Sequence, residues 1–247
     1  MSEIEGGAEA GATLMSHLLE LRARLVRAVI GVVAVFLCLM PFAGKLFEMV
    51  ADPLLAVLPP GTPLVAREMM SPFMAPVKLA FYLALIGTAP WLLYQAWAFV
   101  APGLYKREKR LALPLLVSAL LLFYGGCAFA YFLVLPGLSK FLVAFTPDVV
   151  AVQPDPTAYL DFVAVLFLAF GVSFELPVAL VILVALGVVS PRQLSEWRGY
   201  AIIGIFVVAA VITPPDVFSQ LMLAIPMCLL YEAGILAARA VYRKPAD

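Results

Sequence analysis

Long apolar blocks alternate with short polar segments along this chain of 247 residues. A helix needs about 20 apolar residues to cross the hydrocarbon core of a bilayer, which is about 30 Å thick. Several blocks reach that length, and residues 79–101, for example, contain no charged side chain. The pattern predicts an all-α polytopic membrane protein with six transmembrane helices. The predicted spans lie at about 25–41, 73–101, 111–135, 159–186, 199–212 and 218–236.

The segments outside the spans are predicted to belong to one membrane domain, 1–247. Residues 1–13 are expected to form a flexible leader. Residues 14–24 are expected to form an amphipathic helix at the membrane interface, because their leucines repeat at helical spacing beside a polar stripe. The proline-rich segment 42–72 and the segment 136–157 are expected to form structured caps on one side of the membrane.

Three helix starts have capping signals. Asp155 precedes Pro156, which is the arrangement of an N-cap residue followed by proline at the first helical position. Ser190 and Gln193 have the spacing of a capping box. Asp216 ends a tight turn that contains two prolines, and it is expected to cap the sixth helix.

The basic residues are distributed unequally between the two sides of the predicted spans. Of the 16 lysines and arginines, twelve fall on the side of both termini, and four of these are in the loop 99–110. Basic loops stay on the cytoplasmic side, so both termini and this loop are predicted to be cytoplasmic. The first twelve residues contain three glutamates and no base, unlike a secretory or transit peptide. This favours a bacterial plasma (inner) membrane.

The fifth and sixth predicted spans are short. Residues 199–212, at about 1.5 Å of rise each, cover only about 21 Å. Two interpretations stay open: the short spans thin the surrounding bilayer, or both helices extend through the polar residues that flank them. The third span is expected to end at Pro136, because proline ends or kinks a helix.

Composition and motifs exclude several functional classes. The chain is 64% hydrophobic and 13% charged, and its three cysteines lie inside apolar blocks without CxxC spacing. These features argue against a disulfide framework and a metal site. With one histidine, no GxSxG motif and no glycine-rich phosphate loop, the chain is predicted not to be an enzyme and to need no metal or cofactor. No nucleic-acid partner is expected.

Polar residues inside or beside the spans are the candidates for function. Glu175 lies within the fourth span, where an ionisable group is costly and by default functional, and Pro177 is expected to kink the helix beside it. Glu175 would serve a proton- or ion-coupled small-solute transporter, or it could be a protonated group that only specifies helix packing. Glu20 has a simpler role as an i,i+4 partner of Arg24, and neighbouring bases could neutralise Glu108. Nearby aromatic residues are most simply interfacial anchors and core: Trp91, Trp97, Phe99 and Tyr105.

Six stretches of the sequence together resemble the TatC family, the receptor subunit of the twin-arginine protein translocase. They occur in the family's order and cover most of the chain from His17 to Glu232. They are HLLELRARL from His17, MSPF from Met70, YQAWAFVAPGLYKREKR from Tyr94, LLFYGGCAFAYF from Leu121, FGVSFELPV from Phe170 and TPPDVFSQLMLAIPM from Thr213.

The resemblance implies a receptor and assembly scaffold. Family members recognise the twin-arginine signal peptide of a folded cargo at the cytoplasmic face and recruit single-span subunits of the TatA and TatB type. Transport is driven by the protonmotive force, and a homo-oligomer in contact with membrane lipids is also implied. Two carboxylates suit two adjacent arginines, because a guanidinium binds a carboxylate through two parallel hydrogen bonds.

The resemblance also assigns residues to three sites. The residues of the signal-peptide site are Glu20, Arg22, Phe99, Leu104, Tyr105 and Glu108. Glu175 belongs to a partner-helix site in a concave groove. The periplasmic turn and cap positions are Pro53, Ser71, Pro72, Asp216 and Gln220.

Overall fold

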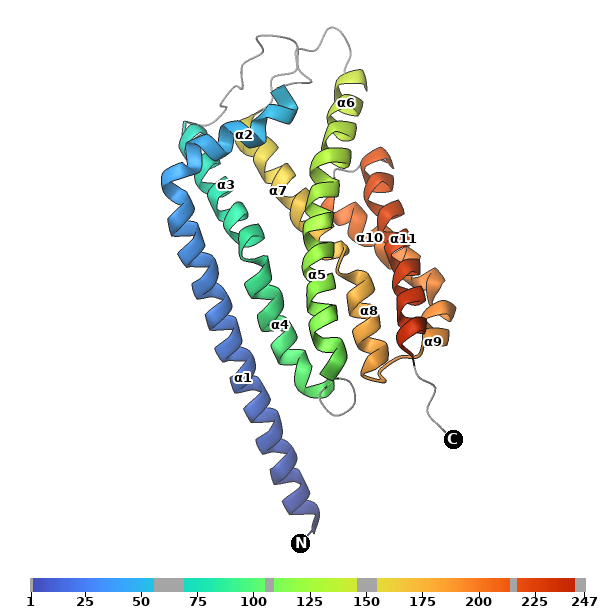
Figure 1. Cartoon of the computed structure of the whole chain (residues 1–247). Helices are drawn as coiled ribbons and strands as arrows, with labels where there is room; N and C mark the ends of the chain where they lie inside the picture. The colour runs from blue at the N-terminus through green and yellow to red at the C-terminus, as the bar shows by residue number, and fades with distance from the viewer. Residues whose placement is uncertain (1, 56–68, 105–108, 146–154, 214–216, 243–247) are drawn as a thin grey trace.

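The computed structural model describes residues 2–55, 69–104, 109–145, 155–213 and 217–242, and every regular element in these ranges is a helix (Figure 1). The prediction of an all-α protein is confirmed. In chain order the elements are α1 Ser2–Leu39, η1 Met40–Phe42, α2 Ala43–Leu55, α3 Ser71–Gly87, α4 Ala89–Leu104, α5 Lys109–Phe129, η2 Ala130–Val134, α6 Leu135–Phe145, α7 Pro156–Ser173, α8 Leu176–Ala185, α9 Pro191–Glu196, α10 Arg198–Ile212 and α11 Val217–Val241.

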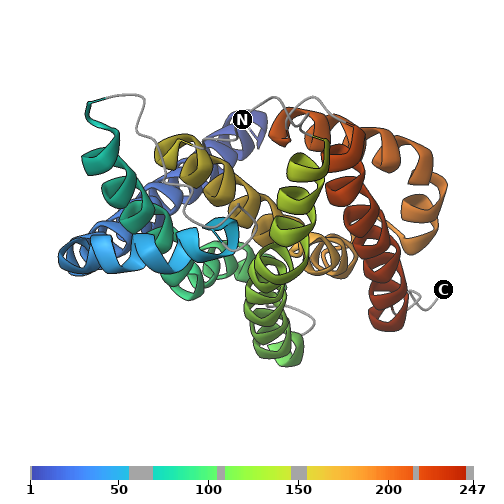
Figure 2. The ribbon, with the colours of Figure 1, turned by 90° about the horizontal axis from the view of Figure 1, so that it is seen from above.

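The helices form a bundle with two distinct ends (Figure 1). The first part of α1 and the last turns of α4, α8 and α11 lie at one end, here called the terminal end. The opposite end, here called the cap end, carries α2 and the last turns of α6. Figure 2, a view from the cap end, places α1 to α3 toward one edge of the bundle and α10 and α11 toward the other.

α1 is one helix of 38 residues. The sequence predicts a flexible leader at 1–13 and a separate interfacial helix at 14–24, but the backbone is helical without interruption from Ser2 to Leu39. No proline occurs before Pro41, so the segment contains no residue that would force a break between leader, interfacial helix and span.

The predicted second span, 73–101, consists of two helices, α3 and α4, that meet at an angle of 47° at Thr88. The bend has a physical cause, because Pro90 has no N–H group to donate to the carbonyl of Ile86. The hydroxyl of Tyr124, on α5, donates to that carbonyl at 3.2 Å instead. A neighbouring helix therefore satisfies the backbone group that the proline leaves unpaired.

The third span does not end at Pro136. The helix continues from α5 through the π-helical turn η2 into α6, which ends at Phe145. In η2 the N–H of Leu135 donates to the carbonyl of Ala130, five residues back. This wider turn lies directly before the proline and accommodates it without ending the helix. The predicted stop at Pro136 is therefore wrong, and the segment 136–157 begins as a helix.

The fourth predicted span, 159–186, is interrupted near its middle, as Pro177 predicts. α7 ends at Ser173, α8 begins at Leu176, and Glu175 is the N-cap residue of α8. The N–H of Glu175 donates to the carbonyl of Val172 at 3.0 Å. This bond spans three residues, so the chain tightens before the second half of the span.

Both capping predictions that fall on described residues are confirmed. The side chain of Asp155 accepts hydrogen bonds from the N–H groups of Thr157 and Ala158, at 2.8 and 3.0 Å. Ser190 and Gln193 form both halves of a capping box at the start of α9. Asp216 lies outside the described residues.

The last two long helices differ in length. α10 has 15 residues, or about 22 Å, so the fifth span is short as predicted. α11 has 25 residues and continues to Val241, so it is longer than the predicted span 218–236. Arg198 pairs with Glu232 at 2.6 Å, so this charge within α11 has a counter-ion on α10. The interpretation that a helix extends through its polar flank therefore holds for α11.

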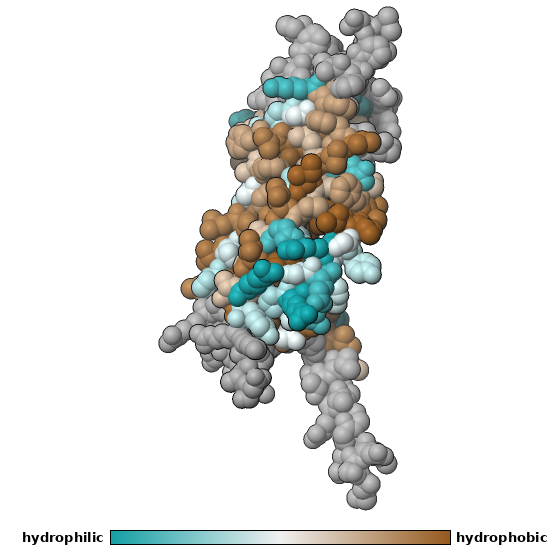
Figure 3. Space-filling model, turned by 90° about the vertical axis from the view of Figure 1, so that its right-hand side faces the viewer, coloured by the Kyte–Doolittle hydropathy of each residue, from teal (hydrophilic) through white to brown (hydrophobic). Residues whose placement is uncertain are grey.

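The helices have the length and composition of a membrane protein. Among the described residues, four helices are long and apolar enough to cross a membrane, or five if α3 and α4 form one bent span. α10 is apolar but shorter. Large apolar side chains are exposed along the outer surface, and in Figure 3 they cover the middle of the visible face above a polar patch at the terminal end.

Close helix contacts in this bundle rely on glycine. A Cβ atom on Gly126, in α5, would lie 2.5 Å from the carbonyl oxygen of Phe170, in α7. A Cβ on Gly234, in α11, would lie 2.9 Å from the Cα of Pro177, in α8. Small residues allow helix backbones to approach closely in a membrane, where packing replaces the hydrophobic effect as the force between helices.

We expect Gly126→Ala to lower the stability of the fold by about 1–3 kcal/mol, because its methyl group would overlap a backbone carbonyl that cannot move independently. The midpoint of thermal unfolding in detergent measures the effect. Gly125→Ala is the matched control, since a Cβ at Gly125 meets no atom within 4 Å. Equal midpoints for the two variants would contradict the packing described here.

Candidate functional site

Glu20 lies on α1 near the terminal end and forms an ion pair with Arg24. The Nε and Nη2 atoms of Arg24 donate to Oε1 of Glu20 at 3.0 and 2.6 Å. The Glu20 side chain is 38% exposed and that of Arg24 is 19% exposed. The simple i,i+4 interpretation of Glu20 is therefore confirmed, and the half-exposed carboxylate remains accessible. Arg22, two residues on, is exposed.

The other residues assigned to the signal-peptide site fall on α4 and the segment after it. Phe99 is half-buried in α4. Leu104 is the last residue of α4, and its side chain is outside the described set. Tyr105 and Glu108 lie outside the described residues altogether. α1 packs on α4, and the last turn of α4 lies at the terminal end, so the helix that precedes Glu108 runs beside the helix that carries Glu20 (Figure 1).

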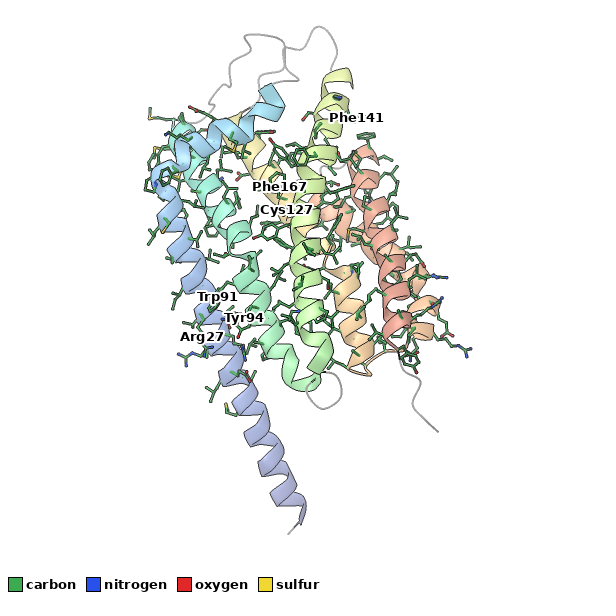
Figure 4. The ribbon with its side chains drawn as sticks, in the orientation of Figure 1. Arg27, Trp91, Tyr94, Cys127, Phe141 and Phe167 are labelled. Atoms are coloured by element: carbon green, nitrogen blue, oxygen red, sulfur yellow. The ribbon has the colours of Figure 1, made fainter. Side chains whose placement is uncertain are left out.

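Trp91 connects these two helices. Its indole N–H donates to the backbone carbonyl of Arg27, on α1, at 3.1 Å. The rings of Trp91 and Tyr94 stack with centroids 6.0 Å apart and planes 28° apart, and Figure 4 shows both side chains directed from α4 toward α1. The sequence predicts only an interfacial anchor for Trp91. Its specific partner was not predictable, because a backbone carbonyl has no residue-type signature.

Glu175 lies at the junction of α7 and α8, inside the apolar span Thr157–Ala185. It is the N-cap residue of α8, but its side chain makes no capping hydrogen bond. Its Oε1 atom is buried and has no hydrogen-bond partner among the described residues. An unsatisfied polar atom costs more inside a bilayer than in water, because no solvent replaces the missing partner. Glu175 is therefore a buried acceptor without a donor.

Gln95, on α4, is a second polar residue with a buried oxygen inside a span. The sequence did not single it out. The residue is 5% exposed. Its Oε1 atom also lacks a hydrogen-bond partner within the described parts of the chain. The available signal was a single amide side chain in the uncharged block 79–101. Intramembrane amides that are buried away from lipid usually bond to a neighbouring helix.

A second polar cluster joins α3 to α7 toward the cap end. Lys78 Nζ lies 2.8 Å from Asp161 Oδ2, and the hydroxyl of Tyr82 donates to Asp161 Oδ1 at 3.3 Å. Nearer the helix starts, the hydroxyls of Ser71 and Thr157 share a hydrogen bond. The polar groups in this cluster bond to one another and hold α3 and α7 together. Unlike Glu175, Asp161 therefore has a partner for each of its carboxylate oxygens. In the sequence, Lys78 is one of the four bases on the side away from the termini, and no local pattern identifies Asp161 as its partner.

The remaining cap residues are spread over three elements. Ser71 and Pro72 form the first turn of α3, where Pro72 is exposed. Pro53 lies within α2. Gln220, on α11, donates from Nε2 to the carbonyl of Phe206, on α10, at 3.1 Å. Gln220 thus ties the two C-terminal helices together. No cluster of three or more His, Cys, Asp or Glu side chains that could hold a metal occurs in the described part of the chain.

Removing one member of the α3–α7 ion pair should cost more than removing both. Lys78→Met leaves Asp161 charged without its counter-ion, and because the two side chains are 42% and 39% exposed we expect a loss of only about 0–1 kcal/mol. The double variant Lys78→Met with Asp161→Leu should lose less, because no uncompensated charge remains. Thermal unfolding of the three proteins in the same detergent tests this. A double variant less stable than Lys78→Met would contradict it.

Comparisons with known proteins place this arrangement among solved and curated relatives. Residues 16–226 match the family described as "Sec-independent protein translocase protein (TatC)". The protein of that name from Escherichia coli (strain K12) is 51% identical over 226 residues, which cover 92% of this chain and 88% of the relative. The Haemophilus influenzae protein is 48% identical over 234 residues, covering 95% of this chain and 91% of the relative. A crystal structure of the twin arginine translocase receptor TatC has a TM-score of 0.82 and 38% identity, and covers 92% of this chain and 100% of its own.

Proposed function

The chain belongs to the TatC family, and on that premise we propose that it is the receptor that recognises twin-arginine signal peptides and the scaffold on which the translocase assembles. The resemblance drawn from six sequence stretches is confirmed. The observation that carries the proposal is the likeness of the whole fold to a solved twin-arginine translocase receptor. Family membership does not favour the alternative of a small-solute transporter.

The recognition step of the proposal rests on Glu20 and Glu108. Both hydrogen bonds from Arg24 reach the same oxygen of Glu20, Oε1. An incoming guanidinium can then approach Oε2 without displacing Arg24, and a second arginine would bind Glu108. Exposed ion pairs contribute only about 0–1 kcal/mol each. We therefore expect apolar contacts to add to binding, with Phe99, Leu104 and Tyr105 as the candidates and Arg22 at the rim.

The membrane orientation is part of the same proposal. It has six spans, with α3 and α4 counted as one bent span and α10 as a short one, in a bacterial inner membrane. Basic residues gather near the terminal end, and the described ones are Arg22, Arg24, Arg27, Lys109, Arg110, Arg192, Arg198 and Arg239. The cap side has Lys45, Lys78 and Lys140 among its described residues. By the positive-inside rule the terminal end faces the cytoplasm.

The assembly step rests on Glu175. Its buried oxygen lacks a donor among the residues that the structure describes, so a donor on a single-span subunit of the TatA or TatB type would satisfy it inside a concave groove. Several copies of this chain would share one receptor complex in contact with lipids, with transport driven by the protonmotive force. The short helix α10, about 22 Å long, would thin the bilayer beside that site.

We expect the double variant Glu20→Ala with Glu108→Ala to lower photo-crosslinking of a twin-arginine signal peptide at least about tenfold, which corresponds to about 1.4 kcal/mol. Replacing the peptide's arginine pair by two lysines should have a similar effect, because an ammonium lacks the planar set of five donors with which a guanidinium binds carboxylates. Glu48→Ala, on the exposed face of α2 at the cap end, is the control and should bind like the wild type. Undiminished crosslinking by the double variant would rule out the receptor site.

Glu175→Leu should separate assembly from folding. Leucine removes an unsatisfied buried oxygen, so we expect the unfolding midpoint to stay equal or to rise. Co-purification of the single-span subunits should fall severalfold, while signal-peptide crosslinking persists. Glu175→Gln keeps an acceptor and should retain most of the co-purification. A lower midpoint together with normal co-purification would assign Glu175 to packing alone.

A further inference from the structure

The first part of α1 leaves the bundle at the terminal end as an extended helix, here called the N-terminal arm and defined as residues 2–26 (Figure 1). One side of the described part of the arm faces outward, because its large apolar side chains are exposed: Met15, Leu18, Leu19, Leu21, Leu25 and Val26. Directly after the arm, the Arg27 carbonyl accepts the hydrogen bond from Trp91, and Figure 4 labels both residues at this point. Trp91 therefore marks the place where α1 becomes fixed to the bundle.

The contact between Trp91 and α1 depends on a glycine. A Cβ atom on Gly31 would lie 2.7 Å from Cδ1 and 2.9 Å from Nε1 of the Trp91 ring. The indole thus rests directly on the backbone of α1, one turn beyond the carbonyl to which it donates. The Trp91 ring also stacks against Tyr94. Packing and a hydrogen bond together define one orientation of α1 relative to α4.

We propose that Trp91, packed on Gly31, is a positioning residue for signal-peptide recognition, because it sets the direction of the N-terminal arm and thereby the place of Glu20 relative to α4. The inference rests on the proposed receptor function. Glu20 is about 16 Å along the helix from Gly31. A tilt of about 20° at Gly31 would therefore move Glu20 by about 5 Å, more than a hydrogen bond tolerates.

The same contact relates the two carboxylates of the proposed site. α4 begins two residues before Trp91 and leads at its other end into the segment that contains Glu108. Glu20 is on the helix that Trp91 holds, and Glu108 follows the helix that Trp91 belongs to. The contact between α1 and α4 thus sets where Glu20 lies relative to the helix that leads toward Glu108.

Distances between spin labels test the geometric part. Labels at Leu18→Cys and Ala96→Cys, both exposed positions, would be placed in the full chain in lipid nanodiscs after Cys38, Cys127 and Cys228 are changed to serine. We expect one narrow distance distribution. Gly31→Ala should shift its mean by at least about 3 Å or double its width, and Gly31→Ala with Trp91→Leu should restore the mean, because the smaller side chain removes the overlap. Gly87→Ala is the control, since its Cβ would reach only Val35 Cγ1, at 4.0 Å.

Signal-peptide crosslinking in the same glycine and tryptophan variants, without labels, tests the functional part. We expect Gly31→Ala to lower crosslinking about fivefold or more and Gly87→Ala to match the wild type. The double variant should recover crosslinking only in part, because it relieves the overlap but also loses the indole hydrogen bond. If Gly31→Ala does not accumulate in the membrane, Trp91→Phe, which lacks the indole donor, should broaden the distances and lower crosslinking.

The possible failures are distinguishable. Unchanged distances in Gly31→Ala and Trp91→Phe would overturn the claim that Trp91 fixes the orientation of α1. Shifted distances with wild-type crosslinking would overturn the positioning role and leave the receptor function intact. If the wild type binds no twin-arginine peptide, the receptor function itself fails and the positioning role fails with it, whatever the distances show.

Discussion

Every backbone amide and carbonyl inside a bilayer needs a partner within the protein, because lipid offers none. This constraint explains the contacts that hold the helices together. Pro90 leaves the carbonyl of Ile86 without its helical donor, and Tyr124 of another helix supplies one. Gln220 donates across to the carbonyl of Phe206, and Tyr231 to that of Leu194, where α9 gives way to α10. The Ile86 and Leu194 carbonyls lie at a proline bend and near the end of α9, so these two irregular positions are sites at which one helix contacts another.

Against that background, the two acceptors without donors stand out. The buried oxygens of Glu175 and Gln95 have no partner among the described residues, although the same bundle satisfies Asp161 twice. A chain that supplies donors to displaced carbonyls would be expected to supply them here as well. Positions at which local rules fail tend to be functional. The missing donors are best explained if they belong to another polypeptide, which is the basis of the proposed assembly site.

The sequence predicts features that depend on neighbouring residues and misses those that depend on distant ones. The apolar blocks predict the all-α class. The caps at Asp155 and Ser190 are predicted from local patterns, and the structure contains both. Pro136 has the sequence signature of a helix stop, and the π-turn before it, which lets the helix continue, is invisible in composition. The pairing of Glu232 with Arg198 joins residues far apart in the sequence, so it was not predictable either. For the candidate site, sequence motifs identify Glu20 and Glu175, but not Gln95 or the contact of Trp91 with α1.

α4 connects the proposed recognition site to the bend at Thr88. It contacts α1 through Trp91, buries Gln95 one turn later and then leads through Phe99 toward the segment that contains Glu108. Sixteen residues make a helix about 24 Å long. A tilt of this helix about the bend would move its recognition end and the buried amide together, so the contact of Trp91 with α1, one turn before Gln95, restrains both.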